Sequence, residues 1–299
     1  MLADIESYGV RDRVLLLRGV PAFEPLEEDD LLALAENARV RRYRVSDPIL
    51  IEGAPLESVH IVTDGRARVV RDGQELAEIV GRGHIGLISL LADQPSPGAV
   101  ALAESTTLEV PSEVVTVTTH ESFDIARNSV RLMAAELLRR RGQLPLSTGN
   151  DEPDIGTFRP RPLTLVERMI RIRSVGAFAN ANLDAVAELA KHSREVRFEP
   201  GTKLWAIGEA APWSLRLDYG RVECVNERSE RVVVGAGFTL GALDGVAGMR
   251  RSFTATALTP IIGLELRTAI QLAVLEVHPA LARELRKTLA VMFVSSGGA

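Results

Sequence analysis

The stretch Ile61-Val62-Thr63-Asp64-Gly65-Arg66 has a counterpart 155 residues further along the chain, where Leu217-Asp218-Tyr219-Gly220-Arg221 again ends in Gly-Arg. The same offset matches other residues in the two halves: Ala22 with Ala177, Phe23 with Phe178, Arg39 with Arg194, Arg42 with Arg197, Gly53 with Gly208, and Gly86 with Gly241. Glycines at fixed places in a strand-rich segment mark backbone positions with positive φ or close approach. The chain is therefore predicted to build one fold twice.

Length and composition agree with this duplication. The chain has 299 residues, 46% of them hydrophobic and 25% charged, which predicts two globular domains. Its formal net charge of −5 argues against attraction of the whole surface to nucleic acid. Neither a signal peptide nor a membrane-spanning stretch is expected, so we predict a cytoplasmic protein without membrane insertion. The single cysteine, Cys224, is predicted to be a core residue.

The order of hydrophobic patterns predicts the fold class. Each copy opens with helices in which apolar residues recur at helical spacing, as at Leu31, Leu34 and Ala35. Short β-branched segments separated by glycine-rich turns follow, and each copy ends in helix. We predict a mainly β, α+β protein of two tandem β-roll (jelly-roll) domains, each flanked by N-terminal and C-terminal helices.

The predicted boundaries follow a change in composition between the copies. Residues 142–162 contain several prolines and glycines, which is typical of a linker. The predicted organisation is a first domain over 1–141, a linker over 142–162 and a second domain over 163–299.

One motif points to a different function. The segment Gly81-Arg82-Gly83-His84-Ile85-Gly86 matches the dinucleotide-binding fingerprint, in which a glycine loop brings a helix N-terminus to a pyrophosphate. It lies within a run of short strands with no crossover helix before it. Its counterpart Ala236–Gly241 keeps one of the three glycines. A dinucleotide-dependent enzyme is therefore the least favoured hypothesis.

A better interpretation accounts for both copies. The relevant segments are, in the first copy, Val20-Pro21-Ala22-Phe23, Ile51-Glu52-Gly53 and 61–66, and in the second, Gly176-Ala177-Phe178, Phe198-Glu199-Pro200-Gly201, Gly208-Glu209 and Gly220-Arg221-Val222. In order and spacing they resemble the cyclic nucleotide-binding domain family. The resemblance implies leading helices, a β-roll with a short helix inserted late in it, and C-terminal helices that often dimerise.

The resemblance also implies where a ligand would bind. In this family a phosphate-binding cassette supplies a glutamate for the ribose hydroxyl and an arginine for the cyclic phosphate. In the first copy these positions hold Leu87 and Ser96, so the phosphate would lack its cation. In the second copy Ala242 replaces the glutamate, whereas Arg251 falls on the phosphate-binding position.

The candidate binding residues all lie in the second cassette: Gly241, Arg251, Ser252 and Thr254. Asp244 adds a carboxylate there. It is expected either to pair with Arg251 and close an empty pocket, or to repel a phosphate. Binding of another anionic ligand beside Arg251 stays open as an alternative.

These observations predict a non-enzymatic regulatory or scaffold protein that binds a protein partner. The five histidines are scattered without metal-ligand spacing, and no catalytic motif appears. No cofactor, metal or nucleic-acid partner is expected, and a homodimer through the C-terminal helices is possible. The alternative is a sensor whose second domain binds a cyclic nucleotide, a cyclic dinucleotide or another anion near Arg251.

Overall fold

The computed structural model describes residues 8–295 except 25, 122, 141–143 and 146–153. It divides into two compact units, residues 1–129 with 286–299 (unit 1) and residues 130–285 (unit 2). Two helices contribute to both units, α5 (Phe123–Arg140) and α10 (Pro279–Ser295). The boundaries expected at 141 and 163 stay a prediction.

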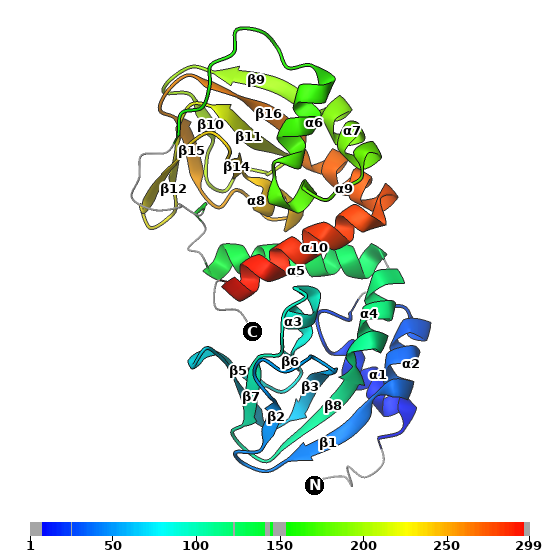
Figure 1. Cartoon of the computed structure of the whole chain (residues 1–299). Coiled ribbons are helices and arrows are strands. Elements are labelled where there is room, and N and C mark those ends of the chain that lie inside the picture. Colours follow the sequence, from blue (N-terminus) through cyan, green and yellow to red (C-terminus); the bar gives the residue numbers. More distant parts are fainter. Residues whose placement is uncertain (1–7, 25, 122, 141–143, 146–153, 296–299) are drawn as a thin grey trace. The chain divides into compact units, whose positions relative to one another are not determined.

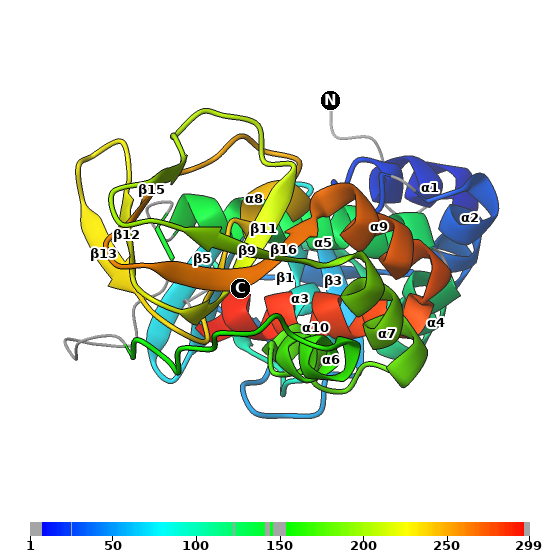
Figure 2. The same cartoon turned by 90° about the horizontal axis from the view of Figure 1, so that it is seen from above.

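Unit 1 is a β-roll with helices at one end. Its elements are α1 (Val10–Arg18), α2 (Glu28–Asn37), β1 (Arg39–Tyr43), β2 (Pro48–Leu50), β3 (Ser58–Asp64), β4 (Arg66–Arg71), β5 (Gln74–Val80), β6 (His84–Ile85), α3 (Leu87–Leu91), β7 (Gly98–Ala101), β8 (Ser105–Pro111) and α4 (Ser112–Glu121). They form two antiparallel sheets, ordered β1-β8-β3-β6 and β2-β7-β4-β5. The helices α1, α2 and α4 gather away from β5 in both views (Figures 1 and 2).

Unit 2 repeats this arrangement. Its elements are α6 (Leu165–Arg173), a 3-10 turn (Gly176–Phe178), α7 (Leu183–His192), β9 (Arg194–Phe198), β10 (Lys203–Trp205), β11 (Trp213–Tyr219), β12 (Val222–Val225), β13 (Arg231–Val234), β14 (Thr239–Leu240), α8 (Ala242–Val246), β15 (Thr254–Ala257), β16 (Ile261–Arg267) and α9 (Thr268–Val277). Its sheets are ordered β9-β16-β11-β14 and β10-β15-β12-β13. The two orders correspond strand for strand, so the predicted duplicated fold is confirmed.

The repeated glycine before each arginine has a steric reason. Gly65 and Gly220 follow equivalent strands, with φ of +86° and +98°. A side chain at either position would collide with backbone, because a Cβ would lie 2.5 Å from the carbonyl oxygen of Glu104 or 2.3 Å from that of Pro260. Glycine alone fits such a turn without strain. The repeat therefore reflects one backbone path followed twice.

Each roll is filled by the inward side of its strands and the helices beside them. Unit 1 buries Leu17, Phe23 and Leu34 of the helical region against Ile61 and Leu108 of the strands. Unit 2 has a cluster that contains Trp205, Leu215, Cys224 and Phe253. Cys224 is fully buried, and burial raises its thiol pKa, so the predicted core role of this cysteine is confirmed.

The glycine-rich segment Gly81–Gly86 has no place in a dinucleotide-binding unit. It joins β5 to β6 and leads into α3, which has five residues, within an antiparallel roll. A dinucleotide fingerprint needs a parallel strand followed by a longer helix whose N-terminus meets the pyrophosphate. The backbone context therefore disfavours that hypothesis.

Candidate functional site

The second cassette is built around Arg251. Its side chain is 2% exposed, although it lies between α8 and β15 at a bend of the chain. Nη1 donates to the carbonyl of Gly241 at 3.3 Å, and Nη2 donates to the carbonyl of Trp213 at 2.5 Å. Both terminal nitrogens of the guanidinium, which would meet a phosphate, are thus bonded to backbone oxygens.

Two tryptophans enclose the same guanidinium. Its central carbon lies 4.0 Å from the ring centroid of Trp205 and 5.2 Å from that of Trp213. The two rings are themselves edge to face, with centroids 5.0 Å apart. A planar cation against aromatic faces is stabilised electrostatically, and more strongly where water is excluded. Arg251 therefore fills the cassette as a buried, partnered group.

Gly241 permits this approach. It precedes α8 with φ of +71°, and a Cβ there would lie 2.0 Å from Nη1 of Arg251. Of the predicted site residues, the structure thus brings Gly241 and Arg251 into direct contact. Thr254 lies further along, where its hydroxyl accepts from the amide of Ile207 at 3.1 Å.

Asp244 does not form the expected ion pair. Its carboxylate accepts from the amide of Ser252 at 3.1 Å, and among the described residues it interacts with Arg251 by charge alone. Burial raises the pKa of Asp244, and burial lowers the pKa of Arg251. Each charge still favours ionisation of the other, so the two groups interact through space rather than by contact.

The first cassette is also occupied by an arginine, but from another element. Arg71, at the end of β4, donates from Nη2 to the hydroxyl of Ser89 at 2.9 Å and to the carbonyl of Pro95 at 3.3 Å. Nη1 donates to the side-chain oxygen of Gln94 at 3.2 Å. Ser96, at the family's arginine position, is buried and donates to the carbonyl of Pro97.

The role of Arg71 was not predicted from the sequence. An arginine at a strand end usually faces solvent, and the corresponding residue of the second copy is Asn226. Asn226 bonds within its own hairpin, where its side-chain oxygen accepts from the amides of Arg228 and Glu230. In the sequence, Arg71 is marked by the tight Asp72-Gly73 turn that follows it. That this turn brings Arg71 to the cassette is seen in the structure.

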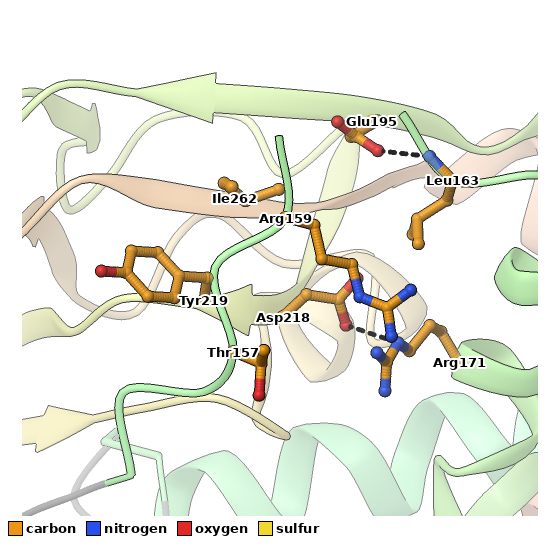
Figure 3. Close-up of a pocket in the computed structure, with 8 residues that line it drawn as sticks. All are labelled: Thr157, Arg159, Leu163, Arg171, Glu195, Asp218, Tyr219 and Ile262. Carbon is orange, nitrogen blue, oxygen red and sulfur yellow. Dashed lines mark hydrogen bonds and ion pairs between the residues drawn. The ribbon is translucent and has the colours of Figure 1, made fainter. Parts of the chain in front are cut away.

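Unit 2 also contains a small pocket (Figure 3). Its lining includes Arg159 and Arg171, with the carboxylates of Glu195 and Asp218. None of the predicted site residues lines it.

The described residues contain no group of three or more histidine, cysteine, aspartate or glutamate side chains able to hold a metal ion. Nor does the described part contain a helix long and apolar enough to cross a membrane.

Comparison with known proteins supports the domain type. Residues 40–117 match the family model for the cyclic nucleotide-binding domain, which confirms the predicted resemblance. A comparison with curated protein sequences gave no match.

Solved structures give distant likenesses. The regulatory subunit of a cAMP-independent protein kinase A from Trypanosoma brucei shares 16% identity over 89% of this chain and 87% of that chain, with a TM-score of 0.35. Its counterpart from Trypanosoma cruzi, bound to guanosine, shares 15% over 95% and 91%, with a TM-score of 0.35. The sensor domain of the transcriptional regulator DNR from Pseudomonas aeruginosa shares 18% over 46% and 96%, with a TM-score of 0.40.

Proposed function

We propose that this chain is a non-enzymatic regulatory scaffold in which two cyclic nucleotide-binding-type units hold a protein partner without cyclic nucleotide. One observation carries the proposal. The guanidinium of Arg251 is bonded to two backbone carbonyls and enclosed by Trp205 and Trp213. A phosphate at this position would have to turn the guanidinium away from at least one of these carbonyls and desolvate its own charge, and such exchanges cost several kcal/mol.

The first cassette supports the same conclusion. Leu87 occupies the position at which the family places its ribose-binding glutamate, and it is 2% exposed within the core. Arg71 donates to three oxygens of the cassette itself. In both units an internal arginine thus supplies the contacts that hold the cassette together, and the shape does not need a ligand.

The alternative is a sensor that binds a nucleotide-like anion in unit 2. It is favoured by Nε of Arg251, which is buried and has no hydrogen-bond partner in the described structure. In that case Gly241, Arg251, Ser252 and Thr254 would surround the ligand. An anion would need to rotate the guanidinium away from the carbonyl of Trp213.

Isothermal titration calorimetry separates the two functions. Cyclic AMP, cyclic GMP and a cyclic dinucleotide would each be titrated into the full chain and into the Arg251→Ala variant. The scaffold predicts no saturable heat in either protein. Saturable heat that disappears in Arg251→Ala would establish the sensor instead.

A homodimer through the C-terminal helices is a further part of the proposal. Four apolar residues of these helices, Val130, Ala134, Leu137 and Leu289, are buried within the single chain. A dimer therefore needs another face of these helices. Light scattering of the full chain at tens of micromolar protein tests this, and a monomeric mass would exclude the dimer.

A further inference from the structure

Residues 154–163, which precede α6, lie along unit 2 as an extended segment that we name the strap. The strap is held through its backbone: the amide of Gly220 donates to the carbonyl of Ile155 at 2.8 Å, and the amide of Ala236 donates to that of Asp154 at 2.8 Å. Gly156 forms an antiparallel bridge with Tyr219. The strap thus binds the turn after β11 in the way that an added strand binds a sheet edge.

The fit is close at one residue. Gly156 has φ of +78°, and a Cβ there would lie 2.4 Å from the carbonyl oxygen of Asp218 and 2.7 Å from the side chain of Ala236. A larger residue therefore cannot occupy this position while the strap is bound.

Two prolines restrict the backbone of the strap to the extended conformation in which it is bound. Pro160 and Pro162 alternate with Arg159 and Arg161, and a residue before proline is biased to extended backbone. The free segment therefore loses less conformational freedom on binding than an ordinary chain would. Both arginines bind Glu167, Arg159 at 3.0 Å and Arg161 at 2.7 Å.

The surface beneath the strap is charged in one copy only. Because α1 and α6 match in length and register at the repeat offset, residues can be compared directly. Glu195, Arg171 and Asp218 correspond to Val40, Leu16 and Thr63 of the first copy. Glu195 accepts from the strap amide of Leu163 at 2.8 Å, and Arg171 lies 3.6 Å from Asp218. The second copy thus has charged side chains where the strap lies (Figure 3).

Asp218 is incompletely satisfied at the centre of this surface. Its side chain is 10% exposed, and Oδ2 is buried without a partner in the described structure. Figure 3 shows its carboxylate facing the guanidinium groups of the strap's Arg159 and of Arg171 of α6. Because Oδ2 of Asp218 has no hydrogen-bond donor among the described residues of this pocket, the strap does not use every polar contact that the surface beneath it offers.

The strap is bound by polar groups more than by apolar burial. Leu163 is 5% exposed, but Phe158, whose ring lies 5.5 Å from that of Tyr219, remains 56% exposed. Exposed ion pairs and a few backbone bonds give low local stability, so such segments open before the fold does.

We propose that unit 2 carries a peptide-binding groove formed by Asp218, Tyr219, Gly220, Glu195 and Glu167, which the chain's own strap occupies at rest. The partner it fits is an extended protein segment of the strap's chemistry, with proline-fixed backbone, a glycine at the turn and arginines facing Glu167. Such a segment displaces the strap. This inference rests on the proposed scaffold function, because it names the class of partner.

Fluorescence polarisation with a labelled peptide of residues 154–163 tests the groove. The Gly156→Val variant of the full chain releases the strap and leaves the groove open, so it should bind the peptide at least about tenfold more tightly than the wild-type chain. Adding Glu195→Val, the first copy's residue, should weaken binding again. A peptide carrying the same glycine-to-valine change is the matched control and should not bind. Equal binding to both chains, or none to a folded Gly156→Val variant, would overturn the proposal.

Hydrogen exchange on the wild-type chain keeps the test decisive if Gly156→Val does not fold. The amides of Gly220 and Ala236, which donate to the strap, should exchange at least about tenfold faster than that of Leu217, which donates to Phe238 within the roll. Equal rates would show that the strap does not open and would refute displacement. Nucleotide calorimetry is independent of both readouts, so failure of the scaffold function and failure of the groove are distinguishable.

Discussion

At the scale of single residues, an arginine bonds to each cassette, Arg251 from within the second cassette and Arg71 from β4 in the first. Arg251 occupies the position expected from the sequence, but its donors point to Gly241 and Trp213 rather than to an open pocket. A buried guanidinium with carbonyl and aromatic partners is a structural group as much as a charged one.

Removing Arg251 should therefore destabilise the fold. We expect Arg251→Ala to lower the free energy of unfolding by about 3 kcal/mol, because two carbonyls lose a donor, a cavity opens and Asp244 loses its nearby cation. Urea denaturation of the full chain measures this. Arg250→Ala is the matched control, since Arg250 is exposed and, within the described part of the chain, its side chain donates to the carbonyl of Gly208. Equal losses in the two variants would contradict a structural role for Arg251.

His60 gives unit 1 a predictable dependence on pH. It is 2% exposed, with Nδ1 3.1 Å from the hydroxyl of Thr107 and Nε2 3.2 Å from that of Ser58. Burial lowers its pKa from 6.5 to about 4, a shift that Glu109 opposes and Arg41 reinforces. Between these values the unfolded chain binds a proton that the folded chain does not, so this contribution to stability falls as pH falls from 6.5 to 4.

The loss attributable to His60 should total about 3 kcal/mol at the acid end of that window. Unfolding measured at several pH values, in wild type and in His60→Gln, isolates it from the other titrating groups. The variant should show a shallower slope between pH 4 and 6.5. Identical slopes would mean that His60 binds its proton equally in the folded and unfolded states, which would contradict the lowered pKa.

At the scale of elements, two glycines that flank α8 allow the cost of left-handed backbone to be distinguished from the cost of a steric clash. Gly241 and Gly248 have similar φ values, +71° and +67°, but a Cβ at Gly248 meets nothing within 4 Å whereas one at Gly241 meets Arg251. Gly248→Ala should cost about 1 kcal/mol for left-handed backbone alone. Gly241→Ala should cost at least about 2 kcal/mol more, because it expels the guanidinium. Thermal unfolding of both variants compares them, and equal losses would show that Arg251 is not packed against Gly241.

The elements themselves could be predicted because their signals are local. Glycines at fixed spacing, alternating strands and helical stripes each depend on neighbouring residues, and both rolls follow them. The hydrogen-bond partners of the arginines in the two cassettes could not be predicted. The direction of Arg251 depends on Trp213, which is 38 positions away, and Arg71 reaches its cassette from a different hairpin. The strap was predicted as part of a linker because its prolines and glycines are typical of one, although residues 154–163 lie along unit 2.

At the scale of the whole molecule, the duplication preserves the fold and changes what each copy does with it. Both units keep the strand order and the glycine turns, yet neither keeps the family's glutamate, since Leu87 and Ala242 stand in its place. Among the described residues, Glu195, Arg171 and Asp218 give the second copy a charged surface beneath the strap, where the first copy has Val40, Leu16 and Thr63. In the proposed function, the two halves serve as shaped surfaces of different specificity rather than as two equal sensors.

The most direct test of this account is the thermal unfolding midpoint of the full chain with and without 1 mM cyclic AMP or cyclic GMP. A ligand with a dissociation constant near 10 μM would add about 2.7 kcal/mol at that concentration, which raises the midpoint by several degrees. The account predicts an unchanged midpoint with both nucleotides. A rise of several degrees that is lost in Arg251→Ala would contradict it and identify unit 2 as a nucleotide sensor.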